Sequence, residues 1–185
     1  MSTGKESDNF YDNFQRNLRS VEERLSLPKG FIVDAINKGD DWSLAMKAGA
    51  IVEGAINSAL EEYWSSAIGD SSVSTTLNRW ITKHSVNGAN GKLELSKTLG
   101  IFTKSQLQSA RRIFTIRNEF AHKASSATKS LHSVYQGLES GPKLEIFDEF
   151  IGKVDVLGSF PVEVKFRLAF GVDLLLFISN ETVTR

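Results

Sequence analysis

The chain has 185 residues, with 22 basic and 22 acidic side chains and no cysteine. This length favours a single domain, and the balanced charge excludes a protein that binds polyanions through bulk positive charge. The missing cysteines exclude disulfides, thiolate nucleophiles and cysteine-ligated metal sites. The three histidines, His84, His122 and His132, do not have the spacing of a metal site, so we expect neither a metal nor another cofactor.

No segment predicts insertion into a membrane. The most apolar run, 168–178, contains Asp173 and is much shorter than the ~20 residues that a spanning helix needs. The polar stretch 1–8 lacks the apolar segment of a signal peptide. We therefore expect a cytoplasmic protein that has no membrane partner.

Helical periodicity begins near the start of the chain. Apolar residues three and four apart predict an amphipathic helix over 8–26, which ends at Pro28. A short helix is expected over 31–38, because Gly39 follows it and an aspartate at 40 or 41 is a suitable N-cap for the next element.

The strongest prediction is a helix over 42–66 with one apolar half. Many alanines, together with Gly49 and Gly54, keep this half small, which predicts the close approach of a neighbouring helix. Glu53 lies at the edge of the apolar arc.

The rest of the chain also favours helices. They are expected over 73–83, 92–99, 104–123 and 161–179. The segment 124–159 is interrupted by glycines, and within it 144–151 fits either a helix or a strand. The predicted fold class is all-α, a bundle of about five or more helices in a single domain over 1–185.

Positive charge is concentrated in one stretch of this neutral chain. Residues 83–123 contain 8 basic side chains against only Glu94 and Glu119, a net charge of +6. Such a stretch is either a solvated face, which an acidic neighbour complements, or a surface that binds the phosphates of a nucleic acid or nucleotide. RNA is therefore one candidate partner of the 83–123 segment.

The helix expected over 104–123 carries the pattern with the clearest chemistry. Its polar residues form one stripe at spacings of four, three and four, namely Arg111, Thr115, Asn118 and His122. The opposite arc is apolar and is expected to face the core; it contains Ala110, Ile113, Phe114, Ile116, Phe120 and Ala121.

Arg117 falls inside this apolar arc. A buried cation needs an acidic partner, because the loss of its hydration is costly. Glu53 and Asp173 each border an apolar face of another helix, so the wheel predicts a structural ion pair of Arg117 with Glu53 or, second, with Asp173. In this interpretation His122 is a C-terminal cap that the helix dipole favours.

Two sets of residues resemble known families. Arg117-Asn118, followed after three residues by His122, resembles the R-x4-6-H signature of the HEPN superfamily of small α-helical domains. The wider order of motifs is similar to the mannitol-repressor-like family, and it consists of Asp40-Asp41, Val52-Glu53 in the alanine-rich helix, Gly91-Lys92-Leu93 and Leu99-Gly100-Ile101.

The resemblance implies an HEPN-like helical bundle whose core spans 30–123. Residues 1–28 are then an N-terminal helix extension, 124–159 an insertion of uncertain structure, and 161–179 a C-terminal core helix.

In HEPN ribonucleases the Arg and His of this motif, often from two subunits, form a metal-free site that cleaves RNA. The resemblance implies His122 as acid or base, since imidazole titrates near neutral pH, and Arg117 as the cation that stabilises the phosphorane. Asn118 would orient these groups by hydrogen bonds. Flanking phosphates would be bound by Arg111, Arg112 and Lys123.

Many members of the superfamily are not catalytic, and the mannitol-repressor-like family is named for transcription regulation. The resemblance therefore implies first a regulatory or interaction protein. No helix-turn-helix is recognisable, so such a protein would act through a protein partner or as a homodimer rather than by reading DNA. A metal-independent endoribonuclease is the alternative, and a purely structural or nucleotide-binding helical domain is the third.

Geometry constrains the ribonuclease alternative. Positions five apart on an ideal helix point ~140° apart, so Arg117 and His122 do not share a face. They converge only if the helix end is distorted or if each of two subunits contributes one of them.

Overall fold

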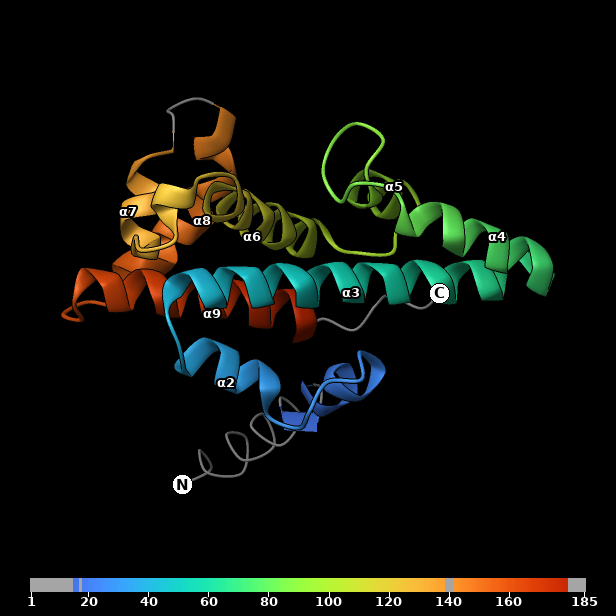
Figure 1. The fold of residues 1–185 in the computed structure, drawn as a ribbon, viewed down its shortest axis with the longest axis horizontal. Coiled ribbons are helices and arrows are strands. Elements are labelled where there is room, and N and C mark those ends of the chain that lie inside the picture. Colours follow the sequence, from blue (N-terminus) through green and yellow to red (C-terminus); the bar gives the residue numbers. More distant parts are fainter. Residues whose placement is uncertain (1–14, 17, 139–141, 180–185) are drawn as a thin grey trace, which may run out of the picture.

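The computed structural model describes residues 15–16, 18–138 and 142–179 (Figure 1). Every regular element in these ranges is a helix and none is a strand, which confirms the predicted all-α bundle. The predicted helix over 8–26 lies partly outside the described residues, but 18–24 are helical. Within the described ranges, no helix is both long and apolar enough to cross a bilayer.

The predicted helices after residue 30 are confirmed to within a few residues. The elements after residue 30 are α2 (Phe31–Asn37), α3 (Asp41–Ile68), α4 (Ser71–Thr82), α5 (Lys92–Thr98), α6 (Lys104–His122), the 3-10 turn η1 (Ala124–Ser126), α7 (Leu131–Gln136), α8 (Pro142–Val156) and α9 (Val162–Ser179). Of these, η1 and α7 were not predicted, and both lie in the glycine-interrupted segment 124–159. Residues 144–151, for which helix and strand both remained open, belong to α8.

The longest helix, α3, is the axis of the bundle (Figure 1). Its N-cap Asp40 accepts a hydrogen bond from the Ser43 amide at 2.7 Å, and Gly69 ends it in the left-handed conformation, with φ of 64°. Its predicted apolar arc is buried and contains Leu44, Ala48, Ile51, Val52, Ala55, Ile56, Ala59 and Leu60.

Two helices, α6 and α9, pack against the first part of α3, and α4 folds back along its second part (Figure 1). In Figure 1, α6 runs opposite to both α3 and α9. Contacts far apart in the sequence agree with this, because Gln106 near the start of α6 bonds to Phe177 near the end of α9. One face of α6 therefore meets both α3 and α9.

The start of α9 is held to α2 and α3 through one guanidinium. Arg167 donates to an Asp41 carboxylate oxygen at 2.7 Å and to the Ile36 carbonyl at 2.9 Å. A Cβ built on Gly171 would lie 2.8 Å from Ile36 Cγ2, so glycine allows α9 to approach α2 closely.

Truncation of the core between α3 and α6 should be costly. Ile56 and Phe114 are both buried, so Ile56→Ala and Phe114→Ala should each lower the free energy of unfolding by about 3 kcal/mol, through lost burial and a cavity. Chemical denaturation measures this, with the largely exposed Val156→Ala as the control that should stay within about 0.5 kcal/mol of wild type. Two core variants as stable as the control would contradict this packing.

Candidate functional site

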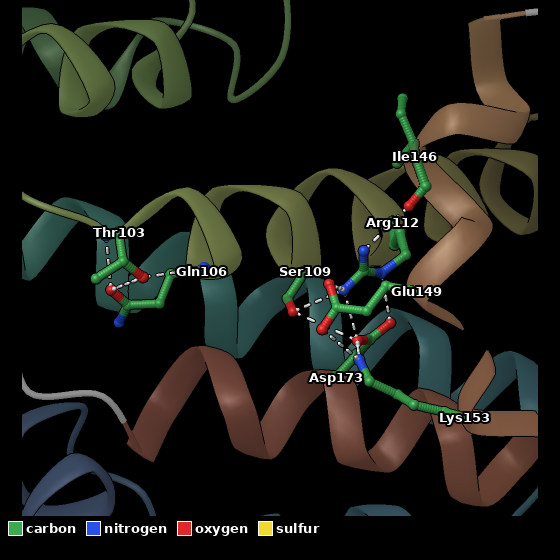
Figure 2. Close-up of polar contacts among 8 residues, drawn as sticks. All are labelled: Thr103, Gln106, Ser109, Arg112, Ile146, Glu149, Lys153 and Asp173. Carbon is green, nitrogen blue, oxygen red and sulfur yellow. Dashed lines mark hydrogen bonds and ion pairs between the residues drawn. The ribbon is translucent and has the colours of Figure 1, made fainter. Parts of the chain in front are cut away.

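The candidate site lies on α6, whose start is defined by a capping box. The Thr103 hydroxyl accepts from the Gln106 amide at 3.2 Å, and the Gln106 side-chain oxygen accepts from the Thr103 amide at 2.9 Å (Figure 2). The side-chain nitrogen of Gln106 also donates to the Phe177 carbonyl at 3.0 Å. The first turn of α6 is thereby attached to α9.

A buried charge cluster fixes the middle of α6 (Figure 2). Arg112 is only 1% exposed, and its Nε and Nη2 each donate to a different carboxylate oxygen of Asp173 at 2.8 Å. Its other hydrogen bonds go to the Ser109 hydroxyl and the Ile146 carbonyl, both at 3.0 Å. This one guanidinium therefore links α6, α8 and α9.

Two further charges from α8 complete the cluster. Lys153 contacts Asp173, and Glu149 lies 3.5 Å from Arg112 and 3.6 Å from Lys153 (Figure 2). The two cations are balanced by two carboxylates. Balanced charge and nearly complete hydrogen bonding are what a buried ionic cluster requires.

The ion pair predicted for Arg117 is wrong. Asp173 binds Arg112 and Lys153, and Glu53 binds the Nζ of Lys92 at 2.9 Å. The side chain of Lys92 is 1% exposed. Each of the two acids is therefore paired with a cation that is more deeply buried than Arg117. Among the residues that the structure describes, Arg117 has no acidic side chain at ion-pair distance.

The assignment of Arg112 to flanking phosphates is also wrong, because its side chain is buried in the cluster. A signal for this was present in the sequence. Ile116, four residues after Arg112, belongs to the predicted apolar arc, so Arg112 lies at the edge of the core-facing arc, about 40° from Ile116 on the wheel. The partner on α9 could not be identified from the wheel.

The other two predicted phosphate-binding residues have partners on the surface. Arg111 lies 3.4 Å from Glu94 on α5, and Lys123 lies 2.6 Å from Glu119. Lys97 donates a hydrogen bond to Glu94, and this bond and the positive charges of Lys97 and Arg111 hold the pKa of Glu94 below its ordinary value. Much of the positive charge of 83–123 is therefore compensated within the fold.

Arg117 crosses α3 at a glycine. A Cβ built on Gly49 would lie 2.9 Å from Arg117 Cγ, so only glycine leaves room for this stem. The close approach predicted for Gly49 is confirmed, and it is made by an arginine side chain. At the far end of this side chain, Arg117 Nη1 donates to the Asn118 side-chain oxygen at 3.1 Å. Gly49 is a residue of the site that sequence reasoning did not assign.

His122 is exposed and is the last residue of α6, which is regular to this point. The distortion of the helix end that would bring His122 and Arg117 together is thus not observed. The hydrogen bond to Asn118 draws the Arg117 guanidinium towards the side of α6 that carries His122, because position 118 is only ~40° from position 122 on the wheel. Within the described ranges, no cluster of His, Asp and Glu side chains has the arrangement of a metal site.

The two arginines should differ sharply in their effect on stability. Arg112→Ala leaves Asp173 without its bidentate partner and should lower the free energy of unfolding by about 3–5 kcal/mol. Arg117→Ala removes no ion pair and should cost about 1 kcal/mol. Urea denaturation of both variants measures this, and equal losses would contradict the pairing.

The contact between Gly49 and Arg117 predicts a coupling between them. Gly→Ala inside a helix ordinarily stabilises by up to about 1 kcal/mol, but here the new methyl must displace the Arg117 stem. Gly49→Ala should therefore be about 1 kcal/mol more favourable in the Arg117→Ala background than in wild type, as a double-mutant cycle shows. Gly152→Ala is the control, since a Cβ there meets nothing within 4 Å, and its effect should be the same in both backgrounds.

Comparison with known proteins adds no relative to this picture. No family model, no curated protein and no solved structure matches the chain.

Proposed function

We propose that the protein is a metal-independent endoribonuclease of HEPN type whose site is formed by Arg117, Asn118 and His122. The observation that carries this proposal is the state of Arg117. Its stem is held against Gly49 and its guanidinium by Asn118, yet no acid among the described residues neutralises it. A positioned cation without an acidic partner suits an anionic ligand.

The chemistry of RNA cleavage needs the groups that this end of α6 carries. The 2′-oxygen attacks the neighbouring phosphorus and loses its proton, while the bond from phosphorus to the 5′-oxygen breaks and that oxygen gains a proton. The products are a 2′,3′-cyclic phosphate and a 5′-hydroxyl. His122 serves one of these proton transfers and solvent the other, and Arg117 stabilises the charge that develops on the phosphorane.

A second candidate is a regulatory or interaction protein, and a different surface favours it. The turn between α8 and α9 exposes large apolar side chains, with Val156 86% and Phe160 53% exposed. Val162 and Val164, at the start of α9, are also exposed. Exposed large apolar residues gathered near one turn suit a protein interface, so a protein partner or a second copy of the chain fits here.

Cleavage of a mixed single-stranded RNA pool in excess EDTA tests the proposal. Wild type should leave 2′,3′-cyclic phosphate ends, and His122→Ala should lose at least about 100-fold of the rate because a proton-transfer group is gone. Arg117→Ala should lose a similar factor through phosphorane stabilisation. Lys104→Ala, which removes an exposed cation at the opposite end of α6, is the matched control and should cleave like wild type.

A mixture of the Arg117→Ala and His122→Ala proteins tells whether one chain supplies both groups. The mixture stays inactive if it does, and it recovers part of the activity if two chains share each site. Wild type that does not cleave RNA under these conditions contradicts the ribonuclease proposal and leaves the regulatory candidate.

A further inference from the structure

A groove between α4 and α5 exposes an aromatic pair. Trp80 is 55% exposed, and its ring centroid lies 3.9 Å from that of His84, with the planes inclined by 51°. The groove encloses about 390 Å³, with Ile81 and Leu95 among its apolar lining and Asn90 and Thr98 among its polar lining. Water is a poor environment for such a large indole surface, so an aromatic partner would be favoured here.

Two chains of contacts connect the groove to the helices that carry the candidate site. On one side Lys92, which lines the groove, binds Glu53, and Glu53 follows Gly49 by one turn of α3, about 6 Å along its axis. Arg117 crosses α3 at this glycine. On the other side Glu94, also in the lining, binds Arg111, the first residue of the polar stripe that ends at His122.

The charges of the groove are compensated. Lys97 and Arg111 neutralise Glu94, and Glu53 neutralises Lys92. The groove therefore neither repels a phosphate chain nor holds one by net charge, and its means of recognition is stacking. Stacking on an aromatic face accepts any base, and bases of single-stranded RNA are free to stack in this way.

We propose that Trp80 and His84 form a stacking platform for a base of single-stranded RNA whose backbone continues towards Arg117 and His122. The choice of RNA as ligand rests on the function proposed above. Arg111 and His122 are about 16 Å apart along α6, so the ligand is a short chain rather than a single nucleotide.

The test measures binding without cleavage. A fluorescein-labelled single-stranded RNA with every 2′-oxygen methylated has no nucleophile for the proposed reaction, so its affinity reports binding alone. Trp80→Ala should weaken this affinity roughly 5- to 100-fold, the range expected for one stacked base, while Trp80→Phe should retain most of it. Trp42→Ala, which removes another exposed tryptophan, is the matched control and should bind like wild type.

A second readout does not depend on the stability of Trp80→Ala. The methylated RNA should quench tryptophan fluorescence in the Trp42→Phe protein, and this quenching should be lost when Trp80→Phe is added. Equal affinity of Trp80→Ala and Trp42→Ala, or quenching that persists without Trp80, would overturn the platform.

The platform and the ribonuclease can fail separately. Loss of cleavage in His122→Ala together with unchanged RNA affinity in Trp80→Ala would overturn the platform and leave the proposed function. Weak binding by Trp80→Ala together with no cleavage by wild type would support the platform and contradict the ribonuclease.

Discussion

A single buried carboxylate, that of Asp173, determines how the α6 helix is presented. It is fully buried, it accepts two hydrogen bonds from Arg112, and it contacts Lys153. An unpaired charge at this depth would be strongly unfavourable, so the three side chains must come together when α6, α8 and α9 pack. Arg112 thereby fixes the rotation of α6 about its axis. With that rotation set, Arg117 faces α3, and Asn118 and His122 lie on the outward side.

The fold uses for its own stability most of the charge that first suggested a phosphate-binding surface. Arg112 is buried together with Asp173, Lys92 is buried and pairs with the partly exposed Glu53, and Arg111 has an acidic neighbour in Glu94. Among the described residues, the cations of 83–123 without an acidic partner are Lys83, Lys104 and Arg117. Of these, only Arg117, held by Asn118, lies towards the end of α6 that carries the exposed imidazole of His122. Under the proposed function, RNA would be recognised by such a surface more through stacking than through counterion release, and its affinity would be less sensitive to salt than that of a broad basic patch.

Periodicity was sufficient to locate the helices outside 124–159, because burial of one face repeats every three or four residues. Within 124–159 it did not identify α7, and it left α8 open between helix and strand. The apolar arc of α3 and the small-residue contact at Gly49 were predictable for this reason. Pairing was not predictable. A helical wheel shows which side of a helix faces inward, but it does not show which neighbouring helix lies opposite, so the acids were assigned to Arg117 rather than to Arg112. Periodicity gave no signal that Lys92 is buried, since it follows a glycine-rich loop that looks solvated, and the sequence singled it out only within the Gly91-Lys92-Leu93 motif of the resemblance.

The separation of Arg112 and Asp173 in the sequence affects how the chain folds as it is synthesised. The two residues are 61 positions apart, and synthesis at roughly 5–20 residues per second needs about 3–12 s to cover that interval. During this time α6 and then α8 become available, but the guanidinium on α6 lacks the buried carboxylate of Asp173 that accompanies it into the interior. A contact between α6 and α8 that excludes water is therefore unfavourable until α9 leaves the ribosome. Until Asp173 has been synthesised, the incomplete core of the nascent chain should stay hydrated, and the chain should remain a substrate for chaperones.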